Sequence, residues 1–211
     1  MAVLQDETGQ RNGPLVPGGT GPPRGLPLGI FVAAATAYQA RQRLDMKSLA
    51  RDLGISRATL YRRAGNREQL LDQVIWWRAR RMLAGQLLGK AALAGPELIG
   101  AVVAGALRAI ERDWPLHRFL DTDTDTALRI LTGSRSVAGR GLTTALECLI
   151  DAERDRGAFR PELDSATLAY AIMRICEGFL YADVIADRPP DTARAVTVIR
   201  ALLAGLDRAA G

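Results

Sequence analysis

The chain has 211 residues, 48% of them hydrophobic, and its 28 basic and 23 acidic residues give a formal net charge of +5. This composition excludes a chain that is disordered throughout, because it contains enough apolar surface to bury the core of one or two domains. The basic residues are concentrated in residues 41–81, which hold eleven of them against four acidic residues. A basic segment joined to a slightly acidic remainder is typical of a nucleic-acid-binding module with a second domain, although a charged run is also common on a solvated helix face.

Residues 1–25 contain six Gly and four Pro and few periodic apolar residues. This composition cannot repay the entropy of ordering and predicts a disordered arm. Whether the arm contacts DNA is left open. Asp6 and Glu7 lie where a secretory leader needs an apolar run, so no such leader is expected.

From residue 27 onward, apolar residues recur at helical spacing and hairpin signals are lacking, which predicts an all-α fold. We expect an N-terminal helix-turn-helix three-helix domain, residues 26–65, and a C-terminal helical-bundle domain for ligand binding and dimerisation, residues 66–211. Trp114 and Pro115 are predicted to end the helix that starts at Gly95. The other helices are expected at about 27–42, 66–88, 124–131, 137–156, 163–186 and 191–208, besides two short helices within 45–63.

Residues 45–63 read DMKSLARDLGISRATLYRR, and several positions suit a helix-turn-helix. Asp45 is placed to cap a short helix, and Gly54 supplies the left-handed conformation needed to turn out of it. Ser56 is placed to cap the next helix, whose Leu60 would pack on the core. This arrangement leaves one face of the second helix exposed at the part that enters the DNA major groove in this motif.

The run LDMKSLARDLGISRATLYRRAGNREQLL, residues 44–71, resembles the N-terminal domain of the TetR family of transcriptional regulators. The resemblance covers about residues 27–75 and implies a homodimer that binds a pseudo-palindromic operator in double-stranded DNA and is released from it, as a repressor, by a small-molecule effector. Two long apolar helices near the C-terminus also favour a bundle completed by a second subunit. A more particular resemblance, to regulators of quorum-signal lactone degradation (the QsdR type), implies a lactone or acyl-lactone effector.

The family resemblance implies that Tyr61 and Arg67 contact phosphate and that Lys47 touches a base or a phosphate. Arg57 and Arg62 carry paired donors of the kind that recognise guanine O6 and N7. The predicted DNA-binding residues are Lys47, Ser56, Arg57, Ala58, Thr59, Tyr61, Arg62, Arg63 and Arg67.

Side chains of the later helices are candidates for lining a small-molecule cavity, since bundle interiors are common ligand sites. The predicted ligand-binding residues are Trp77, Trp114, His117, Phe119, Tyr170, Met173, Cys176 and Phe179. Core packing is the alternative role for each of them.

No catalytic or metal-binding constellation is recognised. Asp121, Asp123 and Asp125 have the spacing of a calcium loop, but the Gly and Glu that such a loop needs at later positions are missing. His117 is the only histidine, and the two cysteines have no metal-ligand spacing. The sequence therefore predicts a protein that is not an enzyme and that uses no metal and no cofactor.

Cys148 and Cys176 both lie within apolar helical patterns, which fits the reducing cytoplasm. Charged residues interrupt the most apolar stretch, 163–185, so no membrane partner is expected. Two alternative functions remain open. A ligand-independent helix-turn-helix DNA-binding protein acting through a protein partner would lack a cavity, and a helical enzyme would hold paired carboxylates with raised pKa values.

Overall fold

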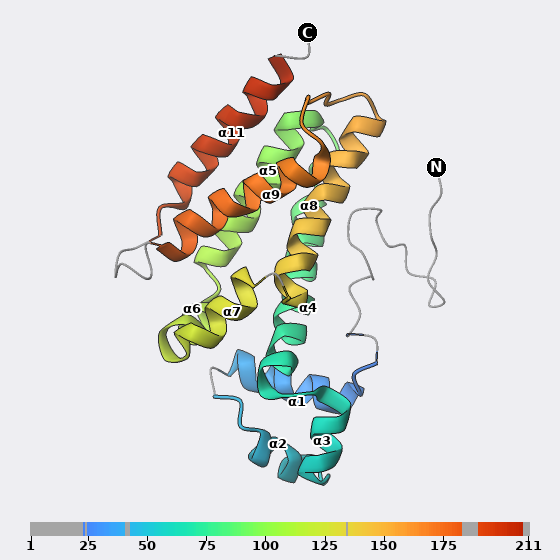
Figure 1. The fold of residues 1–211 in the computed structure, drawn as a ribbon, viewed down its shortest axis with the longest axis vertical. Coiled ribbons are helices and arrows are strands. Elements are labelled where there is room, and N and C mark those ends of the chain that lie inside the picture. The colour runs from blue at the N-terminus through green and yellow to red at the C-terminus, as the bar shows by residue number, and fades with distance from the viewer. Residues whose placement is uncertain (1–22, 24, 41–42, 134, 183–189, 209–211) are drawn as a thin grey trace. The chain divides into compact units, whose positions relative to one another are not determined.

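The structure is a computed structural model that describes residues 23, 25–40, 43–133, 135–182 and 190–208. In these residues the chain forms helices joined by short connections and no strand (Figure 1), which confirms the predicted all-α fold. None of the described helices is both long enough and apolar enough to cross a membrane.

The described chain divides into two compact units. We call residues 20–79 and 113–140 the N-terminal unit, and residues 80–112 and 141–211 the C-terminal unit. The units differ in extent from the predicted domains, which stay a prediction about function. The predicted arm, residues 1–25, lies almost wholly outside the described residues.

Two helices contribute residues to both units, namely α4 (Arg67–Leu87) and α8 (Val137–Asp155). The other helices of the N-terminal unit are α1 (Leu28–Gln39), α2 (Met46–Asp52), α3 (Arg57–Ala64), α6 (Trp114–Thr122) and α7 (Thr124–Thr132). Aromatic pairs join them: Phe31 lies edge-on to Trp77, with ring centroids 5.1 Å apart, and Tyr38 lies edge-on to Phe119 at 6.1 Å. Such edge-to-face contacts add about 1 kcal/mol each to the burial of the rings, so α1 is fixed to both α4 and α6.

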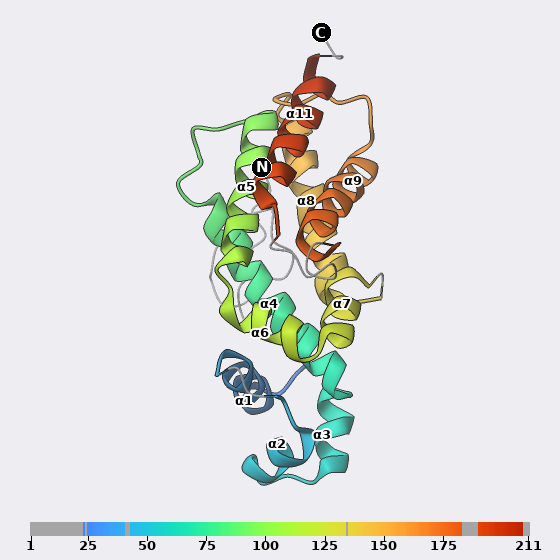
Figure 2. The same cartoon turned by 90° about the vertical axis from the view of Figure 1, so that its left-hand side faces the viewer.

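The C-terminal unit contains α5 (Gly95–Glu111), α9 (Ser165–Glu177), the π-helix η1 (Gly178–Ala182) and α11 (Thr192–Arg208). In two perpendicular views α11 lies alongside α5 and α9 (Figures 1 and 2). At this contact a Cβ atom added at Gly100 of α5 would lie 3.4 Å from the Arg200 side chain of α11, an ordinary van der Waals distance, so the position leaves room for a small side chain.

A buried carboxylate fixes the start of α5. Gly95 has φ of +55°, and its N–H donates to Glu153 Oε2 at 2.7 Å. A Cβ atom at this position would lie 2.2 Å from the carbonyl oxygen of Ala158. Glu153 is fully buried and also forms an ion pair with Arg156. The start of α5 is therefore specified by a carboxylate 58 residues later in the chain.

The prediction that Trp114 and Pro115 only end a helix was wrong, because they also begin α6. The Asp113 carboxylate accepts a hydrogen bond from the Leu116 N–H at 3.2 Å and so caps the new helix. Proline is tolerated in the first helical turn, where its missing N–H would have no partner in any case. An Asp followed by Trp-Pro-Leu is thus a helix start, and this local signal was available in the sequence.

The helix predicted over 163–186 begins at Ser165 and keeps α geometry only to Glu177. It continues as η1 over Gly178–Ala182, and residues 183–186 lie outside the described part of the chain. The π turn lengthens the helix by a locally widened hydrogen-bonding pattern, which apolar periodicity alone does not predict.

Candidate nucleic-acid interface

The turn between α2 and α3 is fixed by hydrogen bonds close in sequence. Asp45 caps α2 by accepting from the Ser48 N–H at 2.8 Å. Gly54 leaves α2 with φ of +64°, and the Ile55 N–H then donates to the Ala50 carbonyl at 3.0 Å. A side chain at Gly54 would be strained by the left-handed backbone, although space is available for it. The predicted roles of Asp45 and Gly54 in the turn are confirmed.

The start of α3 is capped by Ser56, whose Oγ accepts from the Thr59 N–H at 3.1 Å and donates to Thr59 Oγ1 at 3.0 Å. Leu60 and Ala64 are buried and hold one face of α3 on the core. The opposite face, with Arg57 at its start, is consequently turned outward.

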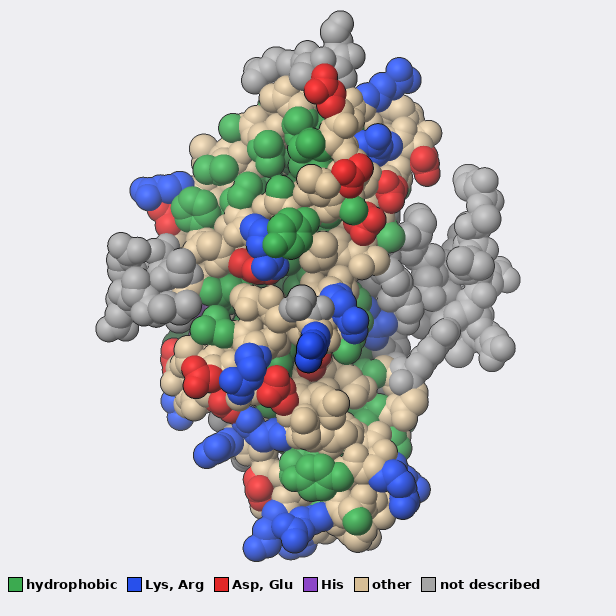
Figure 3. Space-filling view, in the orientation of Figure 1, with side chains coloured by type: hydrophobic (Ala, Val, Ile, Leu, Met, Phe, Trp, Pro, Cys, Tyr) green, Lys and Arg blue, Asp and Glu red, His purple; other side chains and the backbone are tan. Residues whose placement is uncertain are grey.

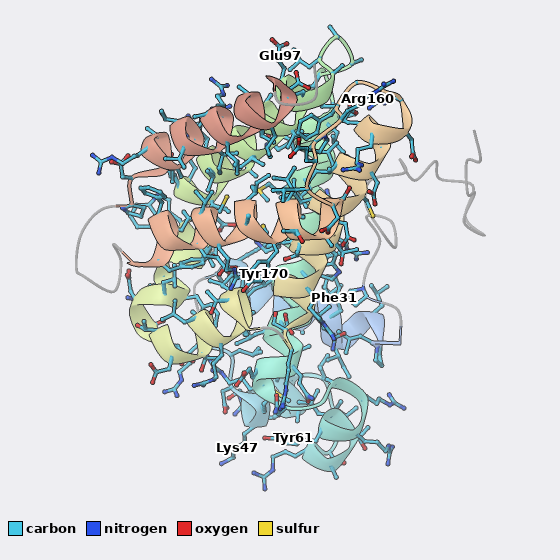
Figure 4. All side chains as sticks on the ribbon, turned by 45° about the horizontal axis from the view of Figure 1, so that its top comes forward. Phe31, Lys47, Tyr61, Glu97, Arg160 and Tyr170 are labelled. Atoms are coloured by element: carbon cyan, nitrogen blue, oxygen red, sulfur yellow. The ribbon has the colours of Figure 1, made fainter. Side chains whose placement is uncertain are left out.

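The outward face of α2 and α3 is basic and includes an exposed aromatic ring. Tyr61 exposes 48% of its surface, and Lys47 and Tyr61 project from the same end of the unit (Figure 4). Lys and Arg side chains gather over α2 and α3 in the space-filling view (Figure 3). Among the predicted DNA-binding residues, the exposed ones are Lys47, Ser56, Arg57, Ala58, Tyr61, Arg62 and Arg63.

Thr59 is half-buried, and its hydroxyl is already engaged by Ser56. Arg51 forms an ion pair with Asp52 at 3.2 Å, with both side chains largely exposed. An exposed pair of this kind contributes little to stability.

Arg67, the first residue of α4, is held within the N-terminal unit. Its Nε–H donates to the Leu44 carbonyl at 2.8 Å, and its Nη1 donates to the Asp123 carboxylate at 2.5 Å. The adjacent Glu68 faces Arg129 of α7 at 3.5 Å. The first turn of α4 is thereby connected to the segment before α2 and to the start of α7.

These neighbours change the pKa of the Asp123 carboxyl group. Partial burial acts to raise its pKa, but hydrogen bonds from Thr126 and Arg67, and the positive charges of Arg67 and Arg43, outweigh burial and lower the pKa below its ordinary value. Asp123 therefore remains ionised opposite Arg67 under mildly acidic conditions.

A second carboxylate of α4, whose role the sequence did not predict, fixes the start of α8. Asp72 is buried and accepts hydrogen bonds from Ser136 Oγ at 2.9 Å, the Val137 N–H at 2.7 Å and the Ala138 N–H at 2.8 Å. It caps the N-terminus of α8 across 64 to 66 residues of sequence. No local pattern identifies such a partner.

The eight predicted ligand-binding residues are distributed over both units. In the N-terminal unit, Trp77 and Phe119 pack against other aromatic rings, and Trp114 lies 66% exposed with its ring centroid 6.5 Å from that of His117. The assignment of these four to a ligand site stays a prediction.

In the C-terminal unit, Tyr170 is 58% exposed, Met173 and Phe179 are half-buried, and Cys176 is buried. Burial raises the pKa of Cys176 to about 12 and also raises that of Cys148. Both thiols are consequently protonated at neutral pH, the form that is a poor nucleophile. Among the described residues, no group of three or more His, Cys, Asp or Glu side chains is arranged to hold a metal ion.

A capped helix-turn-helix with an exposed basic second helix, in an all-helical chain, defines the class of helix-turn-helix DNA-binding regulators. Residues 94–204, more than half of the chain, match the family described as "Tetracyclin repressor-like, C-terminal domain". The chain belongs to the TetR family of transcriptional regulators.

Solved structures agree with this membership. The chain is similar to the transcriptional repressor QsdR of R. erythropolis, with 28% identity, a TM-score of 0.76, and coverage of 83% of this chain and 92% of the other. The fold is also shared with FadR, the fatty acid degradation regulator of Bacillus halodurans (19% identity, TM-score 0.51, 83% and 92% coverage). It is shared as well with FadR of Bacillus subtilis in complex with stearoyl-CoA (15% identity, TM-score 0.53, 83% and 96% coverage). Comparison with curated proteins yields no significant match.

Proposed function

We propose that the chain is a cytoplasmic, homodimeric repressor that binds a pseudo-palindromic operator through α3 and is released by a small-molecule effector. The observation that carries this proposal is the outward face of α3, where Leu60 is buried while Arg57, Tyr61 and Arg62 are exposed. The likeness to the repressor QsdR supports repression over activation.

In the proposed complex the N-terminal part of α3 enters the major groove. Arg57 and Arg62 read guanines, while Tyr61 and Lys47 contact the backbone. Arg63, Ser56, Ala58 and Thr59 complete the proposed surface. The contact of Arg67 with phosphate requires its guanidinium to be shared with, or released from, Asp123 and Leu44, because both partners hold it in the absence of DNA.

The direct test is a fluorescence anisotropy titration of the full chain with duplexes from the DNA upstream of its own gene, compared with a random duplex of equal length. We expect a preference for one upstream site and an affinity that falls steeply as salt is raised, because counterions are released when phosphates are neutralised. Equal binding to random duplex, or insensitivity to salt, contradicts the proposal.

Variants of α3 test how the operator is read. Arg57→Ala and Arg62→Ala should each weaken operator binding by about 1–3 kcal/mol, while binding to random duplex should change less. Arg108→Ala is the matched control, since Arg108 is an exposed arginine on α5. Equal losses on operator and random duplex would mean that these arginines contact only the backbone.

The proposed dimer interface is formed by α9 and α11 of each subunit. Tyr170 on α9 and Val198 on α11 leave 58% and 41% of their surfaces exposed in the single chain. Hydrophobic side chains also gather over this part of the C-terminal unit in Figure 3. Packing against the same helices of a second copy would cover this apolar surface, as expected for two helices rich in apolar residues on more than one face.

For the effector, the resemblance to regulators of quorum-signal lactone degradation makes lactones and acyl-lactones the first compounds to test, with Met173 and Phe179 among the proposed contacts. A ligand that binds only the folded state raises the melting temperature, and does so increasingly as its concentration exceeds its dissociation constant. A panel of such lactones should contain a stabilising compound that also lowers operator affinity, and Phe179→Ala should reduce both effects. If no lactone stabilises the protein, this effector class is excluded while DNA binding remains testable separately.

A further inference from the structure

A small pocket lies on the N-terminal unit between the end of α1, the segment before α2, the first turns of α4, and α6. Its volume is about 30 Å³. This is room for one or two water molecules, or for a single carboxylate group. A whole drug-sized ligand needs several hundred cubic ångströms, so only the head of a larger molecule would fit inside.

The pocket carries an excess of positive charge. Arg43, Arg67 and Arg118 all line it, and the acidic partner of these arginines is Asp123, bound to Arg67. Within the described chain, Arg43 and Arg118 form no ion pair. The pocket wall therefore carries three arginines, of which Arg43 and Arg118 are exposed, against the one carboxylate bound to Arg67, and a concave cationic site of this kind attracts anions.

The acidic and basic groups nearby do not cancel this excess. Tyr38, at the pocket wall, lies under the guanidinium of Arg78, 5.5 Å from the ring centroid, and Arg78 is itself paired with Asp113 at 2.8 Å. That pair is neutral as a whole.

The rest of the wall is apolar and indicates which kind of anion would fit. Leu71, Pro115 and Phe119 form it, and Phe119 is buried while Pro115 is partly accessible. An inorganic anion would leave this surface uncovered. A carboxylate attached to a short aliphatic or aromatic group would satisfy the arginines with its oxygens and cover the apolar wall with its carbon atoms.

We propose that this pocket is a binding site for a small organic carboxylate, held by the guanidinium groups of Arg43, Arg67 and Arg118 against the Phe119 wall. The site shares Arg67 with the predicted DNA-binding residues and Phe119 with the predicted ligand-binding residues, but it goes beyond the proposed operator and lactone functions because it takes a small organic anion. Arginine suits this role because its planar donors match the two oxygens of a carboxylate.

If the proposed function also holds, a carboxylate bound in this pocket would affect operator binding through Arg67. Arg67 donates to Leu44 in the segment before α2 and to Asp123, so a carboxylate in the pocket would add a further partner that keeps the guanidinium inside the unit. Arg67 would then be less available to a DNA phosphate, and the carboxylate should weaken operator binding. By linkage, the operator should weaken carboxylate binding by the same factor.

The test begins without DNA. Sodium butyrate is titrated into the full chain at constant ionic strength with chloride as the balancing anion, and the NMR signals of the arginine Nε–H groups are followed. We expect saturable shifts of the Arg67 and Arg118 signals. Arg118→Gln should raise the dissociation constant of butyrate about tenfold, because one charge-assisted hydrogen bond is lost. Arg118→Lys keeps the positive charge and should restore part of the affinity.

Arg108→Gln is the matched control, because it removes an exposed arginine from the C-terminal unit and should leave butyrate binding unchanged. Circular dichroism verifies that each variant is folded. Shifts that stay linear with concentration, or equal losses in the Arg118 and Arg108 variants, would overturn the proposal. Saturable binding of inorganic phosphate without binding of butyrate would overturn its carboxylate part.

A second measurement, of operator binding, distinguishes a carboxylate site from a site that contacts the DNA phosphate backbone. Without butyrate, Arg118→Gln should bind the operator as Arg108→Gln does, and only the weakening caused by butyrate should disappear. If Arg118→Gln instead weakens operator binding in the absence of any carboxylate, the pocket receives a DNA phosphate and the proposal fails. A failure of operator binding altogether leaves the butyrate titration as an independent result.

Discussion

Single carboxylates of the N-terminal unit connect segments far apart in the chain. Asp72 accepts three hydrogen bonds from residues 136–138, and Asp123 binds Arg67. A buried acceptor such as Asp72 contributes mainly because its removal leaves donors without partners in a place that water reaches poorly, whereas the partly buried Asp123 contributes through its ion pair. The two residues thus lend themselves to separate tests.

Replacing Asp72 with Ala should lower the free energy of unfolding by roughly 3 kcal/mol, since Ser136, Val137 and Ala138 would each lose an acceptor. Urea denaturation followed by circular dichroism measures the loss. Asp121→Ala is the control, because Asp121 is exposed on α6, and it should change stability by less than about 0.5 kcal/mol. Similar effects of the two substitutions would contradict the assigned role of Asp72.

The lowered pKa of Asp123 predicts that the free energy of unfolding depends on pH. Its pKa in the folded state is lowered, so its stabilising contribution is complete above the ordinary value of 3.8 and is lost as the pH falls through the lower folded value. The wild type should therefore be more stable than Asp123→Asn at pH 6, and the difference should shrink below about pH 4. Asp125→Asn, an exposed substitution on α7, should show no comparable narrowing when urea unfolding is repeated across this pH range.

At the scale of the helix, the starts of α2, α3 and α9 are each capped by a side chain three residues before the N–H that it accepts from. Caps of this type contribute about 1 kcal/mol each. They fix where a helix begins, whereas the buried residues Leu60 and Ala64 decide which face of α3 is turned outward. The start of α3, the helix of the proposed DNA surface, is consequently stabilised by the Ser56 hydroxyl.

Ser56→Ala and Asp164→Ala form a matched pair, since each removes the cap of one helix. Both should lower the free energy of unfolding by about 1 kcal/mol. Only Ser56→Ala should weaken operator binding, because α9 is not part of the proposed DNA surface. Thermal unfolding and anisotropy measure the two effects, and a loss of DNA affinity in Asp164→Ala would show that general destabilisation is responsible.

Local signals explain how much of the fold was predictable. The capping of α2 by Asp45, the turn at Gly54, and the reciprocal hydrogen bonds of Asn66 and Gln69, both 2.8 Å, follow from residues within four positions of one another. The start of α6 is also a local signal, which the prediction of Pro115 as a helix stop alone misses. Proline has both meanings, and the preceding Asp113 decides between them.

The candidate site was predictable to the same local extent. The outward face of α3 followed from the spacing of Leu60 relative to Ser56, whereas the position of Arg67 did not. Its partners, Leu44 and Asp123, are 23 and 56 residues away in sequence. Which distant carboxylate faces an arginine is set by tertiary packing, and a single sequence carries no periodicity that reports it.

For the whole molecule, the central expectation is assembly into a dimer. Val198→Glu and Tyr170→Glu would place a charge on the apolar surfaces of α11 and α9, so burying them against a second copy would become costly. Sedimentation velocity should show dimers for the wild type and monomers for these variants. Leu88→Glu is the control, since Leu88 is 78% exposed outside both helices, and its variant should remain dimeric.

The start of α5 also restricts which substitutions the chain tolerates at two positions, Gly95 and Glu153. The Ala158 carbonyl leaves no room for a side chain at Gly95. The Glu153 carboxylate accepts a hydrogen bond from the backbone N–H of Gly95. A side chain at Gly95 would force the backbone away from the Ala158 carbonyl, and replacing Glu153 would leave the Gly95 N–H without its acceptor. We therefore expect substitutions at Gly95 and Glu153 to be tolerated far less well than substitutions at exposed positions of the described helices.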